Sequence, residues 1–395
     1  MRNMARWAAA ACVAMAACVA VGQEAPQDRL PAQEAAAGWL RLFDGQTTFG
    51  WQPRGDARWE VDGGTLRGYG AGDGVIATTG EFANFDLRLD VWMDAQTSGA
   101  IVLRAPLEGR VDEERAFEVT LDPANRRWPP GSVRGVARAA PSGARLRNRW
   151  TPVRVVADGP RLIVEIDGRR VLTTASARHT RGVVALRHRG SGTVRYKDVR
   201  LRPLQLNPLL NGRDLTGWKP IPGRASTFTV TPEGWLRIQN GAGDLQTETV
   251  WGDFVLQLGV FVNGDHLNSG VFFRANAGQF WSGYESQIRN QWQGDDRARP
   301  VDYGTGGVYG RQVARRVVSN DREWFTKTII ASGNHIGVWI DGYQVADYTD
   351  QRNPDQGNAR RGARTAPGVI SLQGHDPATD LSFRDIQVAE MPARR

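Results

Sequence analysis

The stretch Thr328–Val345, TIIASGNHIGVWIDGYQV, decides the fold that this sequence predicts. An apolar run at 328–331 is followed by a Ser-Gly-Asn turn, a second apolar run at 335–340, the pair Asp341-Gly342 and a third run. An Asp-Gly pair between apolar runs predicts a tight hairpin, because a type I′ turn needs positive φ at both central positions. The stretch therefore predicts three consecutive antiparallel strands.

An internal repeat extends this pattern to the rest of the chain. Ile166-Asp167-Gly168 matches Ile340-Asp341-Gly342, and LFDG followed by Gly-Trp at 42–51 recurs as LLNG followed by Gly-Trp at 209–218. The order of the matching motifs is preserved, and a period this long indicates a duplicated domain rather than a solenoid of short units. The boundary falls near residues 203–208, so the short linker predicts two domains in contact.

The composition favours short strands and tight turns, since the chain has 46 Gly and 20 Pro. Outside the N-terminus no long stretch has the 3.6-residue period of an amphipathic helix. Many short strands over roughly 170 residues fit a two-sheet sandwich of the jelly-roll type. We therefore expect an all-β protein with two tandem jelly-roll β-sandwiches, over residues 37–203 and 204–392.

The N-terminus has the pattern of an export signal. Two arginines precede an apolar run, and Ala20-Val21-Gly22 offers a cleavage site, which predicts a signal peptide over residues 1–22. The protein is then exported to the periplasm, the cell surface or the medium. Met15-Ala16-Ala17-Cys18 also resembles a lipoprotein box, which would put a lipid anchor on Cys18. Residues 23–36, rich in Ala, Gln, Glu and Pro, predict a flexible segment.

The net charge of +8 does not by itself indicate a nucleic-acid partner. Only three of the 50 basic residues are lysine, namely Lys197, Lys219 and Lys327, and acidic residues are interspersed among the arginines. Such clusters are typical of solvated faces rather than of a phosphate-binding surface. We therefore expect no nucleic-acid partner. Beyond the signal no stretch approaches 18 consecutive apolar residues, so we also expect no transmembrane segment.

Alternation along two probable strands brings polar residues to one face. Asn268, Phe272 and Arg274 have the same parity, and Glu285 and Gln287 share a face of another strand. A face this polar does not cover a hydrophobic core, and in a curved sheet it would line a sugar-sized groove. An ordinary solvated sheet face is the alternative. The sequence indicates no second carboxylate on this face.

Three further residues are candidates for the same site. His375 follows Leu372-Gln373-Gly374 at the end of a strand, and Asp376 beside it could orient the imidazole for proton transfer. Tyr309 and Trp281 could form stacking platforms for a sugar, although core packing is the more frequent use of aromatic residues. No nucleophile elbow, P-loop or His-x-x-x-His zinc spacing is present.

Six ordered motifs of the second repeat resemble one known family. They are LLNGRDLTGW at 209–218, NSGVFFR at 268–274, GYESQI at 283–288, TGGVYG at 305–310, LQGH at 372–375 and FRDI at 383–386. In this order and over about 185 residues they resemble the 3-keto-disaccharide hydrolase domain, a secreted bacterial family. The resemblance implies a concanavalin-like, laminarinase-like jelly roll that cleaves glycosides oxidised to a ketone at C3.

The first repeat resembles the same family only in part. Glu118 aligns with Glu285, but nothing matches Gln287, and Arg189 stands where His375 is expected. One extra residue before Arg104 suggests a bulge or a shifted register. We therefore expect residues 37–203 to be a degenerate, inactive copy and residues 204–392 to be the active one.

The chemistry that the resemblance implies assigns roles to the candidates. A C3 ketone acidifies the C2 hydrogen, so a base forms an enediolate and the C1 substituent leaves, with or without re-addition of water. Glu285 and His375 are the base and acid candidates, without assignment between them. Arg274 and Gln287 would stabilise the enediolate oxygen, or a divalent cation at His375 would take the place of Arg274. The remaining contacts to substrate are expected from Asn268, Tyr309, Gln373 and Trp281.

A rival interpretation from another class stays open. Sandwiches of this kind serve as lectins as readily as enzymes, so a non-catalytic carbohydrate-binding protein of the cell envelope is the alternative. An enzyme needs Glu285, Arg274 and His375 within reach of one sugar ring, whereas a lectin needs mainly an aromatic platform and amide donors.

Overall fold

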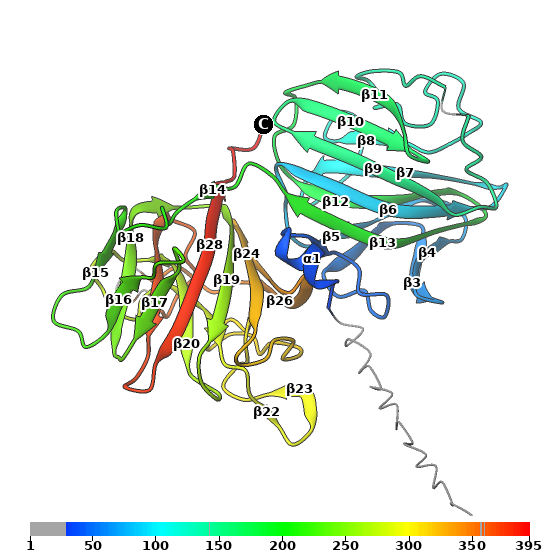
Figure 1. Ribbon diagram of the computed structural model, residues 1–395. Coiled ribbons are helices and arrows are strands. Elements are labelled where there is room, and N and C mark those ends of the chain that lie inside the picture. Colours follow the sequence, from blue (N-terminus) through cyan, green and yellow to red (C-terminus); the bar gives the residue numbers. More distant parts are fainter. Residues whose placement is uncertain (1–28, 142, 356–357, 359) are drawn as a thin grey trace, which may run out of the picture.

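The computed structural model describes residues 29–141, 143–355, 358 and 360–395 of the chain. Figure 1 shows two all-β bodies joined by one short connection, the first coloured blue to green and the second green to red. The predicted signal peptide at 1–22 and the candidate lipidation site at Cys18 lie outside the described residues. No helix in the described part of the chain is long and apolar enough to cross a membrane.

The first body is a two-sheet sandwich. Its strands are β1 Leu40–Arg41, β2 Trp51–Gly55, β3 Arg58–Asp62, β4 Thr65–Tyr69, β5 Gly72–Thr78, β6 Phe85–Met93, β7 Thr97–Ala105, β8 Phe117–Thr120, β9 Thr151–Asp158, β10 Arg161–Ile166, β11 Arg169–Ala175, β12 Val183–Gly190 and β13 Thr193–Pro203. An eight-stranded sheet runs β11-β10-β9-β6-β13-β4-β3, with β1 also beside β13. A five-stranded sheet runs β2-β5-β12-β7-β8.

The second body repeats this architecture. Its strands are β14 Asn207–Pro208, β15 Trp218–Pro220, β16 Thr227–Val230, β17 Leu236–Gln239, β18 Gly243–Trp251, β19 Phe254–Val262, β20 Ser269–Ala275, β21 Tyr284–Ile288, β22 Trp292–Gln293, β23 Asp296–Pro300, β24 Trp324–Ser332, β25 His335–Ile340, β26 Tyr343–Thr349, β27 Gly368–Gly374 and β28 Asp380–Glu390. Its eight-stranded sheet runs β16-β17-β28-β19-β24-β25-β26, with β14 also beside β28. Its five-stranded sheet runs β15-β18-β27-β20-β21, so the prediction of two tandem all-β sandwiches is confirmed.

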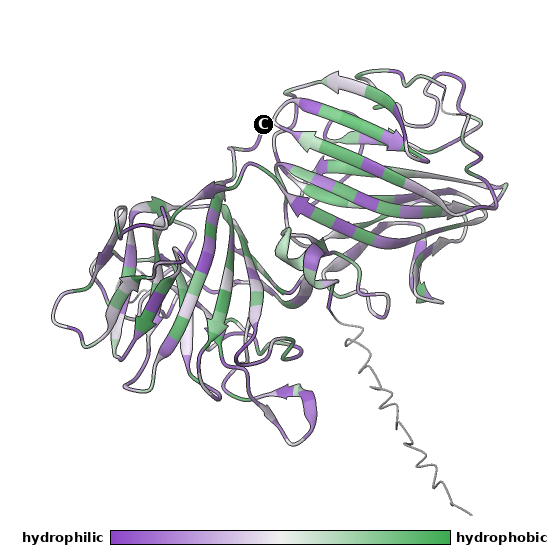
Figure 2. Ribbon diagram, viewed as in Figure 1, coloured by the Kyte–Doolittle hydropathy of each residue, from purple (hydrophilic) through white to green (hydrophobic). Residues whose placement is uncertain are grey.

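Each core lies between its two sheets, where alternate residues of each strand meet. In the second sandwich Leu256 and Leu258 of β19 face Ile370 and Leu372 of β27 across one buried cluster. Figure 2 shows green and purple alternating along many strands, as expected for sheets with one buried face. The outer face of each sheet is therefore free to carry polar side chains.

The predicted hairpins are confirmed in both copies. β24, β25 and β26 pair antiparallel in sequence order, and Asp341 and Gly342 between the last two have φ of 47° and 77°. Asp167 and Gly168 of the first copy have φ of 52° and 74°. Both pairs thus adopt the left-handed backbone that the sequence signal requires.

The two sandwiches contact each other directly. An ion pair of 2.7 Å joins Arg181 to Asp253, and the Thr79 hydroxyl donates to Asp347 Oδ1 at 2.6 Å. Ile330 and Trp339 of the second sandwich belong to the buried hydrophobic cluster of the first. Side chains of the second sandwich therefore pack into the core of the first at this interface.

The chain before the first strand differs from the sequence-based expectation over residues 29–36. Instead of a flexible segment, a short helix α1 (Ala32–Ala36) lies against the second sandwich. Leu30 N–H donates to Asp341 O at 3.2 Å and Gln257 Nε2 donates to Gly38 O at 3.0 Å. These backbone contacts were not visible in composition, because their partners lie more than 200 residues away.

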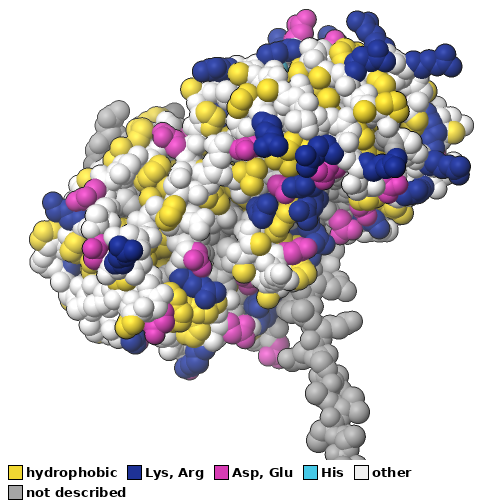
Figure 3. Space-filling view, turned by 45° about the horizontal axis from the view of Figure 1, so that its top comes forward, with side chains coloured by type: hydrophobic (Ala, Val, Ile, Leu, Met, Phe, Trp, Pro, Cys, Tyr) yellow, Lys and Arg dark blue, Asp and Glu magenta, His cyan; other side chains and the backbone are white. Residues whose placement is uncertain are grey.

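Charges of both signs are mixed on the surface. On the face seen in Figure 3, blue Lys and Arg side chains stand among magenta Asp and Glu side chains over both sandwiches. Ion pairs such as Arg154–Asp86, at 2.8 Å, account for part of this mixture.

Candidate functional site

The candidate residues lie on the outer face of the five-stranded sheet of the second sandwich. On β21, Tyr284 and Ile288 belong to the hydrophobic core, so Glu285 and Gln287 point to the opposite side. β20 has the same alternation, because Val271 and its second neighbour Phe273 face the core. The predicted polar face therefore exists and looks away from the sandwich interior.

Four adjacent strands bring this face together. Asp244 of β18 pairs with Gln373 of β27, β27 pairs with β20, and Gly270 of β20 pairs with Gln287 of β21. A Cβ atom at position 270 would lie 2.7 Å from Glu285 Oε1. Glycine is thus required where the Glu285 side chain crosses β20 toward the middle of the sheet.

Glu285 is almost completely buried, with 4% of its surface exposed. Within the part of the chain that the structure describes, its side-chain partner is Arg360, whose Nη2 donates to Oε2 at 3.3 Å. Burial raises the pKa of Glu285 to about 7, opposed by Arg360 and assisted by the charges of Asp302 and Asp244. A carboxyl group with this pKa exchanges protons readily near neutral pH.

Asp244 is a second buried carboxylate on the same face, which corrects the expectation that none is present. It is 1% exposed, and its Oδ2 accepts the Trp281 backbone N–H at 3.2 Å. Burial raises the pKa of Asp244 to about 6, with smaller opposing effects from this N–H and from nearby groups. Two carboxyls with raised pKa therefore sit within electrostatic range of each other.

Asp302 connects the predicted amides into one network. Its Oδ2 accepts hydrogen bonds from Gln287 Nε2 at 2.9 Å and from Asn268 Nδ2 at 3.0 Å. Asn268 Nδ2 is also 3.3 Å from His375 Nε2, and His375 Nδ1 is 2.9 Å from Asp376 Oδ2. His375 has 41% of its side chain exposed, so it stands at the rim of the site.

Buried polar atoms without a partner gather at this face. Among the described residues, Asn268 Oδ1, Gln373 Oε1 and Arg360 Nη1 are buried and make no hydrogen bond. An unpaired buried polar atom costs free energy, typically about 1–3 kcal/mol. Asp244 Oδ1 is also buried without a partner on this face, and such a gathering of polar atoms is the pattern of a site that a polar ligand completes.

The two predicted aromatic platforms also lie here. Trp281 is 46% exposed, and the Arg360 guanidinium carbon is 3.9 Å from the centre of its ring. The Tyr309 ring lies 4.9 Å from that of Tyr303, and Tyr309 N–H donates to Glu285 O at 2.9 Å. An exposed tryptophan beside buried carboxyls is an arrangement that sugars stack on.

Arg274 does not take part in this site, contrary to the sequence-based expectation. Its φ of 49° and a register shift between Phe272 and Ala275 break the alternation of β20. The side chain is fully buried, donating to Gly333 O at 2.6 Å and pairing with Asp253 at 2.8 Å. Arg274 is therefore structural, and Arg360 is the guanidinium that reaches Glu285.

The first sandwich carries the same structural arginine. Arg104 has φ of 53° and donates to Ala83 O at 2.9 Å and His179 O at 2.8 Å. The Ser-Gly and Arg motifs recur in both copies because this bulged arginine ties loops to the sheet. The sequence could not separate this role from substrate binding, since both place Arg at the end of a polar strand.

Glu118, the counterpart of Glu285, has different surroundings. The pairings Val102–Glu118 and Phe272–Glu285 place the two carboxylates at the same point of the fold. Glu118 accepts from Arg189 at 2.7 and 3.0 Å and from Arg134 at 3.2 Å. Burial raises its pKa, but these arginines outweigh burial, so the pKa of Glu118 is lowered.

The described part of the chain contains no preformed set of metal ligands. Within residues 29–141, 143–355, 358 and 360–395, no group of three or more His, Cys, Asp or Glu side chains could hold an ion. The divalent cation that the sequence left open at His375 therefore has no preformed cage there.

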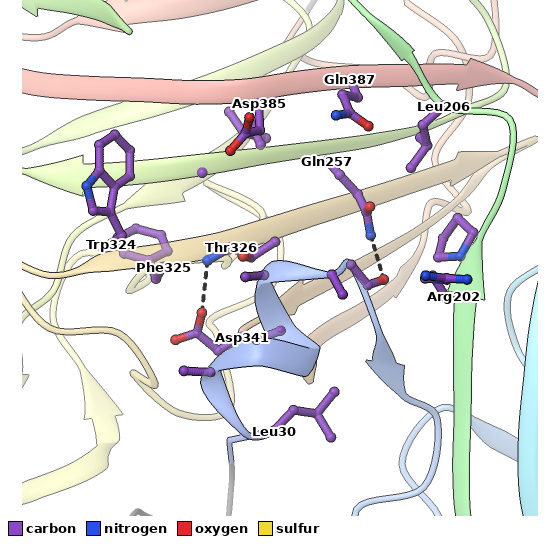
Figure 4. A pocket seen from close by; sticks show the side chains of 18 of the residues that line it. Leu30, Arg202, Leu206, Gln257, Trp324, Phe325, Thr326, Asp341, Asp385 and Gln387 are labelled. Atoms are coloured by element: carbon purple, nitrogen blue, oxygen red, sulfur yellow. Dashed lines mark hydrogen bonds between the residues drawn. The ribbon is translucent and has the colours of Figure 1, made fainter. Parts of the chain in front are cut away.

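A separate cavity of about 1250 Å³ lies between the sandwiches (Figure 4). It is bounded by helix α1, by the connection after β13 and by β19, β24 and β28. Asp341 accepts the Thr326 N–H at 2.8 Å at its wall, and Gln257 donates to Gly38 O. Gln257 thus ties the N-terminal segment to the second sandwich at the wall of this cavity, which does not include Glu285.

Known proteins resemble this chain at the level of the domain. Among solved structures, a proposed glycosyl hydrolase from Parabacteroides distasonis is 21% identical, with a TM-score of 0.40, over 45% of this chain and 99% of its own. The carbohydrate-binding module CBM66 from Bacillus subtilis is 17% identical, with a TM-score of 0.31, over 39% of this chain and 95% of its own. No curated protein matches.

A family match covers most of the chain. The family described as the 3-keto-alpha-glucoside-1,2-lyase-like domain matches residues 38–202 and again residues 205–389. This double match confirms the resemblance predicted from the motifs and supports a carbohydrate-active function. The chain therefore belongs to the family of 3-keto-alpha-glucoside-1,2-lyase-like domains, of which it carries two copies in tandem.

Proposed function

We propose that the second sandwich cleaves glycosides oxidised to a ketone at C3 of the sugar, by elimination across C1 and C2. The observation that carries this proposal is the pair of buried carboxyls, Glu285 and Asp244, with pKa values of about 7 and about 6. A binding protein gains nothing from two carboxyls held near neutrality, whereas proton transfer requires them.

The reaction begins with removal of the proton on C2, which the neighbouring ketone acidifies. Glu285 takes this proton, the C–H electron pair forms the C2–C3 double bond, and the ketone oxygen becomes an enediolate oxyanion. We assign the base role to Glu285 because its higher pKa makes its carboxylate the stronger base of the two, while the lower pKa of Asp244 makes Asp244 the stronger acid.

The second step breaks the glycosidic bond. The electron pair returns from the oxyanion, restores the C3 ketone, forms the C1–C2 double bond and expels the C1 oxygen, which takes a proton from Asp244. Addition of water across the new double bond would give net hydrolysis. No oxocarbenium ion forms, so the carboxylate pair needs no nucleophile role.

The negative charge that develops on the C3 oxygen requires a hydrogen-bond donor to stabilise it. Arg360 Nη1, buried without a partner, is the group of the described site best suited to this task. Asn268 and Gln373 offer amide groups to sugar hydroxyls, and Trp281 offers a stacking surface. His375, exposed at the rim and linked to Asn268, orients the substrate in this proposal rather than transferring the proton.

The proposal includes export of the protein, on the basis of the signal-like sequence at residues 1–22. Substrate would then be met outside the cytoplasm.

The test compares 4-nitrophenyl 3-keto-α-glucoside with the same glucoside bearing a hydroxyl at C3. We expect nitrophenol release from the ketone alone, with a primary isotope effect when C2 carries deuterium. Equal release from both compounds would overturn the ketone requirement. Saturable binding of both without release would favour the lectin-like alternative instead.

A further inference from the structure

Lys327 lies directly behind the strand that carries Glu285. It belongs to β24, in the opposite sheet, and its side chain is fully buried in the core of the second sandwich. Its Nζ donates to Ser286 O at 3.0 Å, Ser286 Oγ at 2.8 Å and Gln287 O at 2.8 Å. The ammonium group thus makes all three of its hydrogen bonds to β21, to the two residues that follow Glu285 and from the core side of the sheet.

A buried ammonium group is costly unless it is paired or fully hydrogen-bonded. Burial lowers the pKa of Lys327 to about 7, and the charge of Glu285 opposes this shift. The residues that pair with Lys327 on the neighbouring strands are uncharged, namely Leu258 of β19 and Ile340 of β25. The carboxylate of Glu285, one residue before Ser286 on β21, offsets part of the cost of burying the cation.

The first sandwich has no such lysine. Val153 pairs with Ile166 as Lys327 pairs with Ile340, which makes Val153 its counterpart. Glu118 instead receives its cations on the outer face, from Arg134 and Arg189. The strand of Glu285 thus has one arginine on its outer face and Lys327 behind it, whereas the cations of Glu118 lie on the outer face.

The choice of lysine is itself informative in a chain that uses arginine for all but three of its 50 basic residues. A compact ammonium fits between two sheets and satisfies three acceptors, whereas a planar guanidinium needs more room and more partners. The site of residue 327 therefore accommodates the compact ammonium group of lysine better than the guanidinium group of arginine.

We infer that Lys327 is a positioning residue, which holds β21 and supplies a second counter-charge to Glu285 from behind the sheet, opposite Arg360. The inference rests on the proposed function for its role in turnover, but its electrostatic part does not. The groups facing Glu285 on the outer side are Arg360, Asp302, Asp244 and Tyr309.

The coupling can be measured without substrate, because the chain has only three lysines. Lysine labelled with ¹³C at Cε gives one NMR signal each for Lys197, Lys219 and Lys327. We expect two signals to titrate near the ordinary lysine pKa of about 10.4 and the third well below it. In Glu285→Gln the third should titrate at lower pH still, because the anion that favours the ammonium is gone. Three signals that titrate together, or a third that ignores Glu285→Gln, would overturn the inference.

Kinetics then test the role in turnover. Lys327→Met keeps the length of the side chain and removes the charge, so kcat should fall with KM nearly unchanged. The acid limb of the pH profile should move to higher pH, because a carboxylate without its counter-cation ionises less readily. Lys219→Met, at an exposed position, is the matched control and should change nothing.

Lys327→Gln separates charge from hydrogen bonding and serves where Lys327→Met does not fold. It should shift the pH profile as Lys327→Met does, since an amide donates but carries no charge. An unshifted profile in a folded Lys327→Gln would overturn the counter-charge role. If neither variant folds, the NMR titration of the native protein decides. Coupling seen by NMR in a protein without lyase activity would reject the proposed function and leave the coupling standing.

Discussion

Glu118 and Glu285 occupy the same place in two copies of one fold and have opposite electrostatic surroundings. Glu118 contacts the guanidinium groups of Arg134 and Arg189, with Arg187 at 3.5 Å, whereas within the described residues Glu285 contacts one guanidinium group, that of Arg360. The pKa of Glu118 is lowered, and that of Glu285 is raised to about 7. The cations around a buried carboxylate thus decide whether its pKa is lowered or raised.

The same contrast holds for the neighbour across the sheet. Asp244 pairs with Gln373 on β18 and β27, and the corresponding pair in the first copy is Val75 with Arg187. A carboxyl and an amide in one copy are replaced by an apolar and a cationic residue in the other. At the position of Asp244 the first copy therefore has no carboxyl group, and at the position of Gln373 it carries a cation.

The strongest test of this contrast removes each carboxylate in turn. Glu285→Gln should lower kcat/KM on a 3-keto-glucoside by roughly 10²–10⁴-fold, the usual loss for a general base. Glu118→Gln should leave the rate per folded molecule unchanged. Inactivation by Glu118→Gln, with full activity in Glu285→Gln, would place the active site in the first copy.

The free energy of unfolding should change in opposite directions in Glu285→Gln and Glu118→Gln. The folded pKa of Glu285 lies above its ordinary 4.5, so the folded protein retains a proton that the unfolded chain loses, and stability falls as pH rises from about 4.5 to about 7. Glu285→Gln should therefore be more stable than the native protein at pH 8, by about 3 kcal/mol.

Glu118→Gln should be less stable at that pH, by about 1–3 kcal/mol, because Arg187 and Arg189 then keep only Asp73, and Arg134 only Glu113, as carboxylate partners among the described residues. The contribution of Glu118 is lost as pH falls through its lowered pKa, the reverse of the Glu285 case. Denaturant titrations at pH 8 and pH 4.5 measure both effects, and equal signs for the two variants would contradict the comparison.

The residue that protonates the leaving oxygen can be identified by comparing the losses in kcat of two variants, which should be smaller than that of Glu285→Gln. Asp244→Asn should cost roughly 10²-fold in kcat and His375→Gln less than tenfold, because His375 stands at the exposed rim. Asp73→Asn, on the corresponding face of the first copy, is the control. The reverse order of losses would return the acid role to His375.

The smallest expected effect concerns the aromatic platform. Trp281→Ala should raise KM up to about tenfold with little change in kcat, since stacking contributes about 1 kcal/mol to binding. Trp150→Ala in the first sandwich removes a similar cation–π contact, with Lys197 at 4.5 Å, and should leave KM unchanged. A fall in kcat for Trp281→Ala would show that the ring orders the catalytic groups.

Local signals in the sequence predicted the fold well. The Asp-Gly turns, the alternation that places Glu285 and Gln287 outward, and the alignment of Glu118 with Glu285 depend on neighbours in the chain, and all agree with the structure. The resemblance to the family was confirmed over both repeats.

The errors and omissions have a common physical cause. Arg274 does not lie on the predicted face, because its own left-handed backbone conformation breaks the two-residue alternation of β20. An arginine side chain gives no sequence signal of such a conformation. Asp244 and Arg360 reach Glu285 from a strand and a loop that are distant in sequence, 41 and 75 residues away. Contacts that form only when distant segments meet cannot be read from periodicity.

The place of Ile330 and Trp339 in the core of the first sandwich bears on how the molecule unfolds. A second sandwich cut free at the connection after Pro203 would present these side chains to water, and its Asp253 and Asp347 would lose their contacts to Arg181 and Thr79. The two sandwiches should therefore melt in a single cooperative transition. The first copy then serves as part of the packing surface of the second, and shortening the chain to one domain would lower the stability on which the buried carboxyls depend.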